Sequence, residues 1–226
     1  MGKYARSETR LTDEMIKESK ELLEAMGIMV VQAPGEGEAQ ASELAKQKEV
    51  YAVASQDYDC LMFKAPKLIQ NLSMARKRKT ATGYREVFPQ IIELPKVLKE
   101  LEINQEQLIC LGILCGTDYN PGGVKGLGPK KSIKIVKEYG GCEKVFKVLE
   151  SDEKFEKYDV EFSWKEIYNE IEKPDVKKDL KIEFPKVNGD KIKKVLMKHE
   201  FSEDRINSQL EKLEGLKKAK IQKTLF

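Results

Sequence analysis

The spacing of apolar residues near the start of the chain predicts short helices alternating with buried strands. Apolar side chains recur at helical spacing through LTDEMIKESKELLEAMG, residues 11–27, and a glycine closes this segment. The apolar run IMVVQAP, residues 28–34, predicts a buried strand. GEGEAQASELAKQ, residues 35–47, predicts a helix, and VYAVAS, residues 50–55, predicts a second strand. Helix, strand, helix and strand in short units favour an α/β fold with a parallel sheet and flanking helices.

The rest of the chain continues with strands and then becomes mainly helical. TATGYRE, residues 80–86, indicates a hairpin-like excursion, and Asn104 has the character of a helix N-cap. A glycine-rich loop leads into a helix at Pro129, a favoured first helical position. From residue 143 the chain is charged and helical in pattern. The segments between are predicted as strands over 68–72 and 91–94 and helices over 95–102 and 104–116.

Composition limits the kinds of chemistry available. The 226 residues are 35% charged, against roughly 25% in an average globular protein, and the formal net charge is only +3. The four cysteines form no CxxC pair, so they are predicted to be reduced core residues. No apolar run approaches the ~20 residues of a membrane helix, and no secretion signal is visible, which predicts a soluble, internal protein without a membrane partner. A single histidine, His199, argues against histidine-based triads and zinc sites.

Acidic residues are then the main candidates for chemistry, and two pairs flank one apolar run. Glu36 and Glu38 open a predicted helix, whereas Asp57 and Asp59 leave the next predicted strand; Asp118 follows a predicted helix. Taken singly, each pair is explained by a helix dipole or a loop turn. Because the carboxyl ends of adjacent parallel strands meet at one edge, their joint placement favours a metal site. Carboxylates suit Mg²⁺, and two such ions can act on a phosphodiester.

The loop GVKGLGPKK, residues 123–131, adds a candidate phosphate-binding element. Glycines allow close backbone approach, and free N–H groups at a helix start bind phosphate oxygens. A simple helix-entry turn is the alternative. A second basic stretch, residues 76–79, is either a further DNA-binding surface or a solvated charge run. The loop and helix start are predicted to hold a DNA backbone without reading bases, through Val124, Lys125, Gly126, Leu127, Gly128, Lys130, Lys131 and Lys134.

The motifs APGEGEAQAS, SQDYDCLMF, LCGTDYNPGGVKGLGPKK and HEFSEDRI together resemble the structure-specific 5′ nucleases, and among them the archaeal-type flap endonucleases. The resemblance implies a PIN-like fold with a helix-two-turn-helix element, two Mg²⁺ ions and cleavage of 5′ flaps on branched double-stranded DNA. It implies a K⁺ ion held by backbone carbonyls near Val124 and Leu127, and a cytoplasmic protein of prokaryotic, archaeal type. The acids Glu36, Glu38, Asp57, Asp59 and Asp118 correspond to metal and catalytic residues of the family.

The resemblance also divides the chain and leaves alternatives open. Residues 1–118 are expected to form an internal nuclease region, 119–215 the helix-two-turn-helix and helical region, and 216–226 a tail. That tail contains an incomplete sliding-clamp peptide at Gln222, Leu225 and Phe226. The family's N-terminal region has no counterpart in this sequence, so the chain alone is expected to be weakly active or inactive. The alternatives are an inactive duplex-binding module and a related 5′ nuclease acting on bubbles or four-way junctions.

Overall fold

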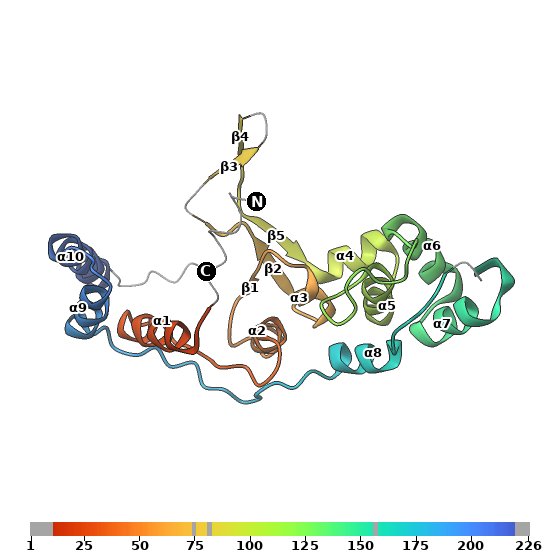
Figure 1. The fold of residues 1–226 in the computed structure, drawn as a ribbon, viewed down its shortest axis with the longest axis horizontal. Helices are drawn as coiled ribbons and strands as arrows, with labels where there is room; N and C mark the ends of the chain where they lie inside the picture. The colour runs from red at the N-terminus through yellow and green to blue at the C-terminus, as the bar shows by residue number, and fades with distance from the viewer. Residues whose placement is uncertain (1–10, 74–75, 81–82, 156–157, 220–226) are drawn as a thin grey trace. The chain divides into compact units, whose positions relative to one another are not determined.

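The computed structural model describes residues 11–73, 76–80, 83–155 and 158–219, and the chain divides into two compact units (Figure 1). One unit joins Met1–Val31 to Lys181–Phe226, and the other comprises Gln32–Leu180. These units do not follow the boundary expected at residue 118, since the proposed helix-two-turn-helix segment belongs to the same unit as the acidic residues. The expected division by function remains a prediction.

The first unit is helical. Its helices are α1 (Asp13–Ala25), α9 (Gly189–Lys198) and α10 (Glu203–Ala219). Helix α1 begins where the Thr12 hydroxyl accepts a 3.2 Å hydrogen bond from the Met15 amide, which satisfies one of the free N–H groups of the first turn. The Asn188 amide donates a 2.8 Å hydrogen bond to the Ala25 carbonyl. This hydrogen bond joins the residue before α9 to the last residue of α1.

The strand predicted over residues 28–34 is wrong. None of the strand pairings in the described part of the chain involves these residues. The Ile28 amide instead donates a 3.0 Å hydrogen bond to the Leu23 carbonyl and closes the end of α1, and 43% of Ile28 is exposed. An apolar run favours a strand only where a neighbouring strand can pair with its backbone.

A small mixed sheet lies in the second unit. Its strands are β1 (Val53–Ala54), β2 (Lys67–Gln70) and β5 (Gln90–Glu93), in the order β1-β2-β5. Strands β1 and β2 are parallel, as the sequence pattern predicts, whereas β5 runs antiparallel to β2, so the sheet is not purely parallel. The expected hairpin is confirmed as β3 (Lys77–Thr80) and β4 (Gly83–Glu86), which extends away from the sheet in Figure 1.

Helices supply most of the core of this unit. The side chain of Asn104 forms a reciprocal capping box with Gln107, which confirms the predicted N-cap, and Pro129 is the first residue of its helix. Phe146 is fully buried and stacks on Trp164, with ring centroids 4.9 Å apart. The helices are α2 (Gly37–Lys46), α3 (Asp59–Met62), α4 (Leu94–Leu101), α5 (Gln105–Cys115), α6 (Pro129–Tyr139), α7 (Cys142–Ser151) and α8 (Trp164–Glu172), with a 3₁₀ turn at Glu153–Phe155. Of these, α2, α3 and α4 contact the sheet.

The cysteines have the expected state. All four are free thiols; Cys60, Cys110 and Cys142 are buried, and Cys115 is partly buried. None of the helices in the described ranges is long and apolar enough to cross a bilayer.

Candidate metal centre and nucleic-acid interface

The loop after β1 carries Asp57, and α3, which follows it, begins at Asp59, so both aspartates lie just beyond the carboxyl end of that strand. The Ser55 amide donates to the Ile69 carbonyl at 3.3 Å, and the buried Gln70 side chain donates to the Gln56 carbonyl at 2.7 Å. Both bonds come from β2 or its end. Strand β2 therefore fixes the backbone that leads into Asp57, at the edge of the sheet where the sequence pattern predicts the acids.

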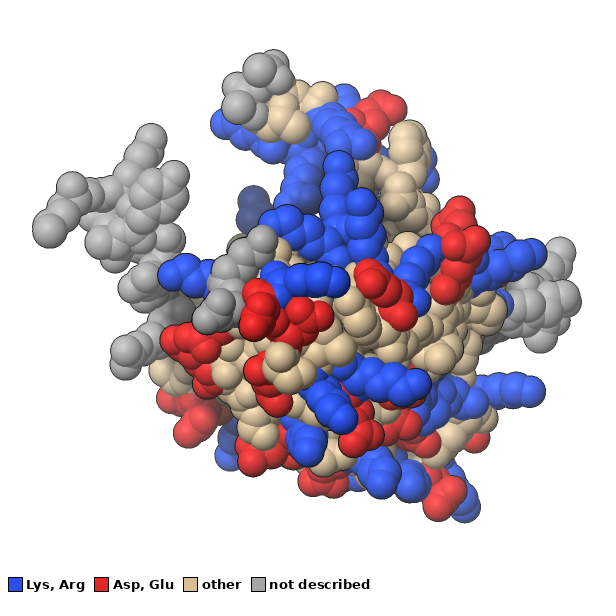
Figure 2. Space-filling model, turned by 90° about the vertical axis from the view of Figure 1, so that its right-hand side faces the viewer, with Lys and Arg blue, Asp and Glu red and all other residues tan. Residues whose placement is uncertain are grey.

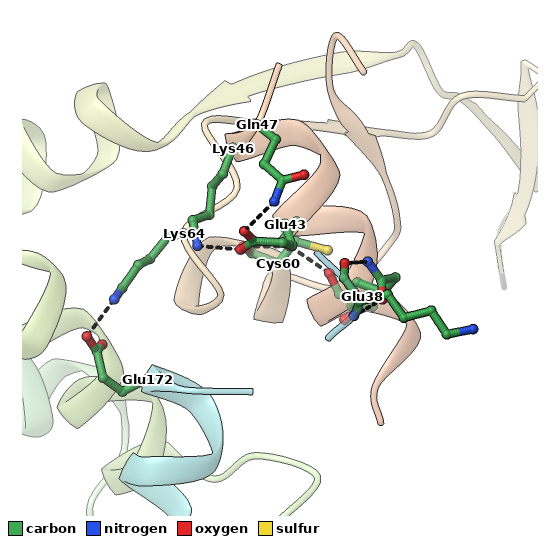
Figure 3. Close-up of polar contacts among 10 residues, drawn as sticks. Glu38, Glu43, Lys46, Gln47, Cys60, Lys64 and Glu172 are labelled. Atoms are coloured by element: carbon green, nitrogen blue, oxygen red, sulfur yellow. Dashed lines mark hydrogen bonds and ion pairs between the residues drawn. The ribbon is translucent and has the colours of Figure 1, made fainter. Parts of the chain in front are cut away.

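Helix α2 brings the second acidic pair to the same place. Glu36 is its N-cap residue, yet the Glu36 side chain makes no capping hydrogen bond. The Ser55 hydroxyl donates a hydrogen bond to the Glu38 carboxylate. Figure 3 shows Cys60 beside Glu38. Burial and the Glu38 charge raise the pKa of the Cys60 thiol to about 12, so this thiol remains protonated.

A buried polar network positions Asp118 beyond the end of α5. The Asn120 side chain donates to the Ile113 carbonyl at 2.8 Å and accepts from the Thr117 amide at 3.1 Å and hydroxyl at 2.7 Å. Thr117 and Asn120 are buried, while Asp118 between them is exposed. A Cβ atom on Gly123 would lie 2.4 Å from the Leu114 carbonyl oxygen, so the returning chain can pass there only as glycine.

Three of the five predicted acids line one cavity. Asp57, Asp59 and Asp118 border a space of about 440 Å³, together with Thr117 and Gly122. Glu36 and Glu38 do not line this cavity. The prediction that both pairs and Asp118 gather at one edge of the sheet still has electrostatic support, because the charges of both glutamates raise the pKa of Asp59.

Asp59 is the acid most affected by its neighbours. Partial burial, followed by the charges of Glu38, Asp118, Asp57 and Glu36, raises its pKa to about 6 from an ordinary 3.8. Burial disfavours the charged carboxylate, and nearby like charges add to that cost. The carboxylates are thus close enough to repel one another, and a bound cation would relieve that repulsion.

The donor chemistry of these residues fits a divalent metal, but their geometry is open. Every candidate ligand is a carboxylate, the hard oxygen donor that Mg²⁺ prefers. Across the residues that the structure describes, no three aspartate, glutamate, histidine or cysteine side chains converge on a single metal position. A metal held here would need further ligands from water, from substrate phosphate or from another polypeptide segment.

The glycine-rich loop leads into α6 with its backbone N–H groups free of a side-chain cap. Gly128 is the N-cap residue and has no side chain to cap the helix; its carbonyl accepts from the Lys131 amide at 3.0 Å. Val124 and Leu127 are buried and hold the loop against the core, and the Leu127 amide donates to the Val124 carbonyl at 3.0 Å. The exposed side chains around this start are Lys125, Lys130, Lys131 and Lys134.

Lys131 differs from its neighbours because its ammonium group already has partners. Its Nζ lies 3.2 Å from the Gly126 carbonyl oxygen and 3.5 Å from the Tyr158 hydroxyl. Both partners are neutral, so neither forms an ion pair with Lys131. Lys125, Gly126, Lys131 and Tyr158 border a cavity of about 860 Å³ beside the loop.

The β3–β4 hairpin carries the second basic stretch. Residues 76–80 and 83–86 are exposed, and Lys77 to Lys79 are consecutive cations along β3, with Arg85 opposite on β4. Figure 2 shows Lys and Arg side chains gathered on this projection. Both strands expose every residue, so the hairpin has little core of its own and presents mainly charge.

Sequence reasoning missed the residues that support the acids. These residues are Ser55, Thr117 and Asn120, whose side chains form hydrogen bonds in or beside the loops that carry the acids. For Ser55, the sequence offered one signal: a hydroxyl residue two positions before an aspartate.

An ion pair links two distant helices of the same unit. Lys64, at the end of α3, pairs with Glu172 of α8 at 2.6 Å across 108 residues of sequence (Figure 3). The predicted clamp residues Gln222, Leu225 and Phe226 lie outside the described residues.

Comparison with known proteins shows which nucleases this chain is similar to. Residues 27–118 match the XPG I-region family model. Flap endonuclease 1 of Aeropyrum pernix is 46% identical over 93% of this chain, which spans 60% of that relative's length. The solved flap endonuclease-1 of Methanococcus jannaschii is 37% identical with a TM-score of 0.75, over 93% of this chain and 60% of its own. The catalytic core of Rad2, solved in complex with DNA substrate, is 26% identical with a TM-score of 0.71, over 92% and 70%. The chain is similar to flap endonucleases over nearly all of its own length and spans about three fifths of the length of these archaeal relatives.

Proposed function

We propose that this chain provides the metal-binding and duplex-binding parts of a 5′ flap endonuclease that hydrolyses phosphodiesters at junctions between single-stranded and double-stranded DNA. The observation that supports the proposal is the raised pKa of Asp59. Burial and the charges of the other four acids raise this pKa to about 6. Clustered carboxylates repel phosphate, so a module that only binds DNA has no use for them. Perturbed carboxylates in a cleft are typical of catalytic metal sites.

The proposed cofactor is Mg²⁺, with two ions in a complete site. Asp57, Asp59 and Asp118 would hold it from the cavity, and Glu36 and Glu38 from the start of α2. Divalent ions supply charge that stabilises the attacking and leaving oxygens of a phosphodiester. The chain's own contribution is to fix the acids: β2 anchors one loop, and the Thr117–Asn120 network anchors the other.

The loop before α6 is the proposed binding site for the DNA backbone. A helix start without a side-chain cap, a proline at N1 and surrounding lysines match phosphate without reading base sequence. The β3–β4 hairpin is a second proposed contact surface.

A K⁺ ion bound by carbonyls near Val124 and Leu127 is part of the same proposal. A sliding clamp is a further proposed partner, through residues 222–226, and the proposed location is the cytoplasm.

A second candidate function is a duplex-binding module that does not cut DNA. It is favoured by the open geometry of the acids, since no three described side chains converge on one metal position. Related 5′ nucleases acting on bubbles or four-way junctions are a further alternative within the same reaction class. Substrate comparison with matched flap, bubble and junction DNAs distinguishes these enzymes from one another.

Metal titration tests the shared site. Mg²⁺ or Mn²⁺ binding to the parent, followed by calorimetry, should give a weak but measurable isotherm that the double variant Asp57→Asn, Asp59→Asn loses. Replacement of the exposed Asp159 by Asn is the control, because that residue lies outside the acidic cavity. Identical isotherms for the parent and the double variant would argue against a shared metal site.

A further inference from the structure

The hydroxyl group of Ser55 bonds to both acidic pairs at once. Its Oγ donates a hydrogen bond to the Glu38 carboxylate and accepts one from the Asp57 amide at 3.1 Å. A serine hydroxyl has one donor and two acceptor positions, so both bonds can exist together. A single side chain thus connects an acid on α2 to the backbone of an acid in the loop after β1.

The backbone around Ser55 is held in place. The Ser55 amide bonds to the Ile69 carbonyl, and the next carbonyl, of Gln56, accepts from the buried Gln70 side chain at 2.7 Å. Ser55 is itself only partly exposed. The hydroxyl therefore projects from an anchored point, and its position is determined by β2 rather than by the acids it contacts.

The fully buried Cys60 lies close enough to Glu38 for the glutamate charge to raise the pKa of its thiol. The Ser42 hydroxyl donates to the Glu38 backbone carbonyl at 2.6 Å, and its oxygen lies 3.3 Å from the Cys60 carbonyl oxygen. Ser42 thus holds the backbone of Glu38, and Ser55 holds its carboxylate. Ser55 is the only one of these donors in the described residues that also contacts the Asp57 segment.

We propose that Ser55 is a positioning residue that sets the separation and orientation of Glu38 relative to Asp57, and that it thereby tunes the divalent-metal site. The inference rests on the proposed function for the metal, but the bridge itself exists without metal. Hydrogen-bonding partners of metal ligands typically influence metal affinity by about 10-fold to 100-fold because they fix the ligand's orientation.

Two variants separate a positioning role from a general structural role. Ser55→Ala removes the hydroxyl, whereas Ser55→Thr retains it on a residue suited to the end of a strand. Ser151→Ala is the matched control, since Ser151 is an exposed serine whose hydroxyl donates only to the Lys147 carbonyl. If Ser55 only fills space, the size of the effect should depend on the change in side-chain volume. If Ser55 positions the acids, the effect should appear when the hydroxyl is lost and disappear when threonine restores it.

The first readout needs no metal. Hydrogen exchange of the Asp57 amide, measured by ¹⁵N NMR in a chelator, should accelerate about tenfold in Ser55→Ala, which corresponds to the loss of one hydrogen bond. The carboxyl ¹³C signal of Glu38 should move in the same variant. Both signals should remain close to the parent's in Ser55→Thr and Ser151→Ala. Unchanged exchange and an unchanged carboxyl signal in Ser55→Ala would overturn the bridge.

The second readout is Mn²⁺ affinity, measured by the fraction of free Mn²⁺ in electron paramagnetic resonance. Ser55→Ala should weaken binding roughly tenfold or more, and Ser55→Thr should restore it. Equal affinity in parent and Ser55→Ala, or failure of Ser55→Thr to restore affinity, would overturn the positioning role. A parent that binds no Mn²⁺ would defeat the proposed metal site instead, and the metal-free signals would still decide whether Ser55 orients the two acids.

Discussion

The side-chain amide nitrogen of Asn120 donates a 2.8 Å hydrogen bond to the carbonyl oxygen of Ile113. Ile113 lies in the last turns of α5, where backbone carbonyls have no partner within the helix. The same Asn120 side chain accepts from the Thr117 amide and hydroxyl. One buried amide thus closes the end of a helix and fixes the loop that carries Asp118.

Replacing Asn120 by Ala should destabilise the second unit by about 2 kcal/mol. The change leaves the Thr117 donors buried without their partner, and an unsatisfied buried polar group costs about 1–3 kcal/mol. Urea unfolding measures the effect. Asn169→Ala, at an exposed position on α8, should change stability by less than about 0.5 kcal/mol. Equal midpoints for the two variants would show that the network carries no stability.

Asp59 should make the metal-free chain less stable at neutral pH than at mildly acidic pH. Its native pKa of about 6 exceeds the ordinary 3.8, so the native state binds the proton more tightly than the unfolded state. Stability contributed by that proton is present below pH 3.8 and is lost as the pH rises through 6. Asp59→Asn removes this dependence.

Urea unfolding in a chelator at several pH values measures this effect. At a pH of about 7.5 Asp59→Asn should be more stable than the parent by roughly 1 kcal/mol, a value reduced for solvent screening because Asp59 is only partly buried. The advantage should shrink as the pH falls toward about 4. An Asp59→Asn variant that is less stable than the parent at neutral pH would mean that the carboxylate is stabilised by its surroundings. Asp159→Asn serves as the control.

The loop before α6 should contribute to salt-dependent duplex binding. Lys130→Ala with Lys131→Ala should reduce the slope of log affinity against log salt, by about 0.9 for each phosphate that the variant no longer neutralises. Lys137→Ala is the control on the same helix, because its ammonium already pairs with Glu102 at 2.7 Å. Binding of duplexes of different sequence should fall equally. An unchanged slope in the double variant would shift the main binding surface to the β3–β4 hairpin.

Local signals in the sequence predicted those features that depend on neighbouring residues. Asn104 and Pro129 each define a helix start through their own chemistry, and both predictions are confirmed. The hairpin predicted around TATGYRE is likewise confirmed by the pairing of β3 with β4. The strand over residues 28–34 failed because pairing depends on a distant partner, which no local pattern reports.

The candidate site shows the same contrast. The acids were identifiable by type and spacing, and three of them line one cavity. Their supports were not predictable, because the bond from Gln70 to Gln56 depends on the register of β2 beside β1, and the Ser55 bond to Glu38 depends on where α2 lies. The antiparallel direction of β5 also required the structure, since a period of two residues is the same for either strand direction.

Incision of a 5′-flap duplex tests the central claim most directly. The chain alone, and the chain mixed with the remaining portion of an archaeal relative, would be incubated with labelled flap DNA and Mg²⁺. Because the described acids do not converge on one metal position, we expect negligible incision by the chain alone and Mg²⁺-dependent incision at the junction in the mixture. Glu38→Gln or Asp118→Asn should abolish that incision while leaving duplex binding. Incision by the mixture that persists in both variants, or no incision in any combination, would contradict the proposal that these acids form the catalytic metal site.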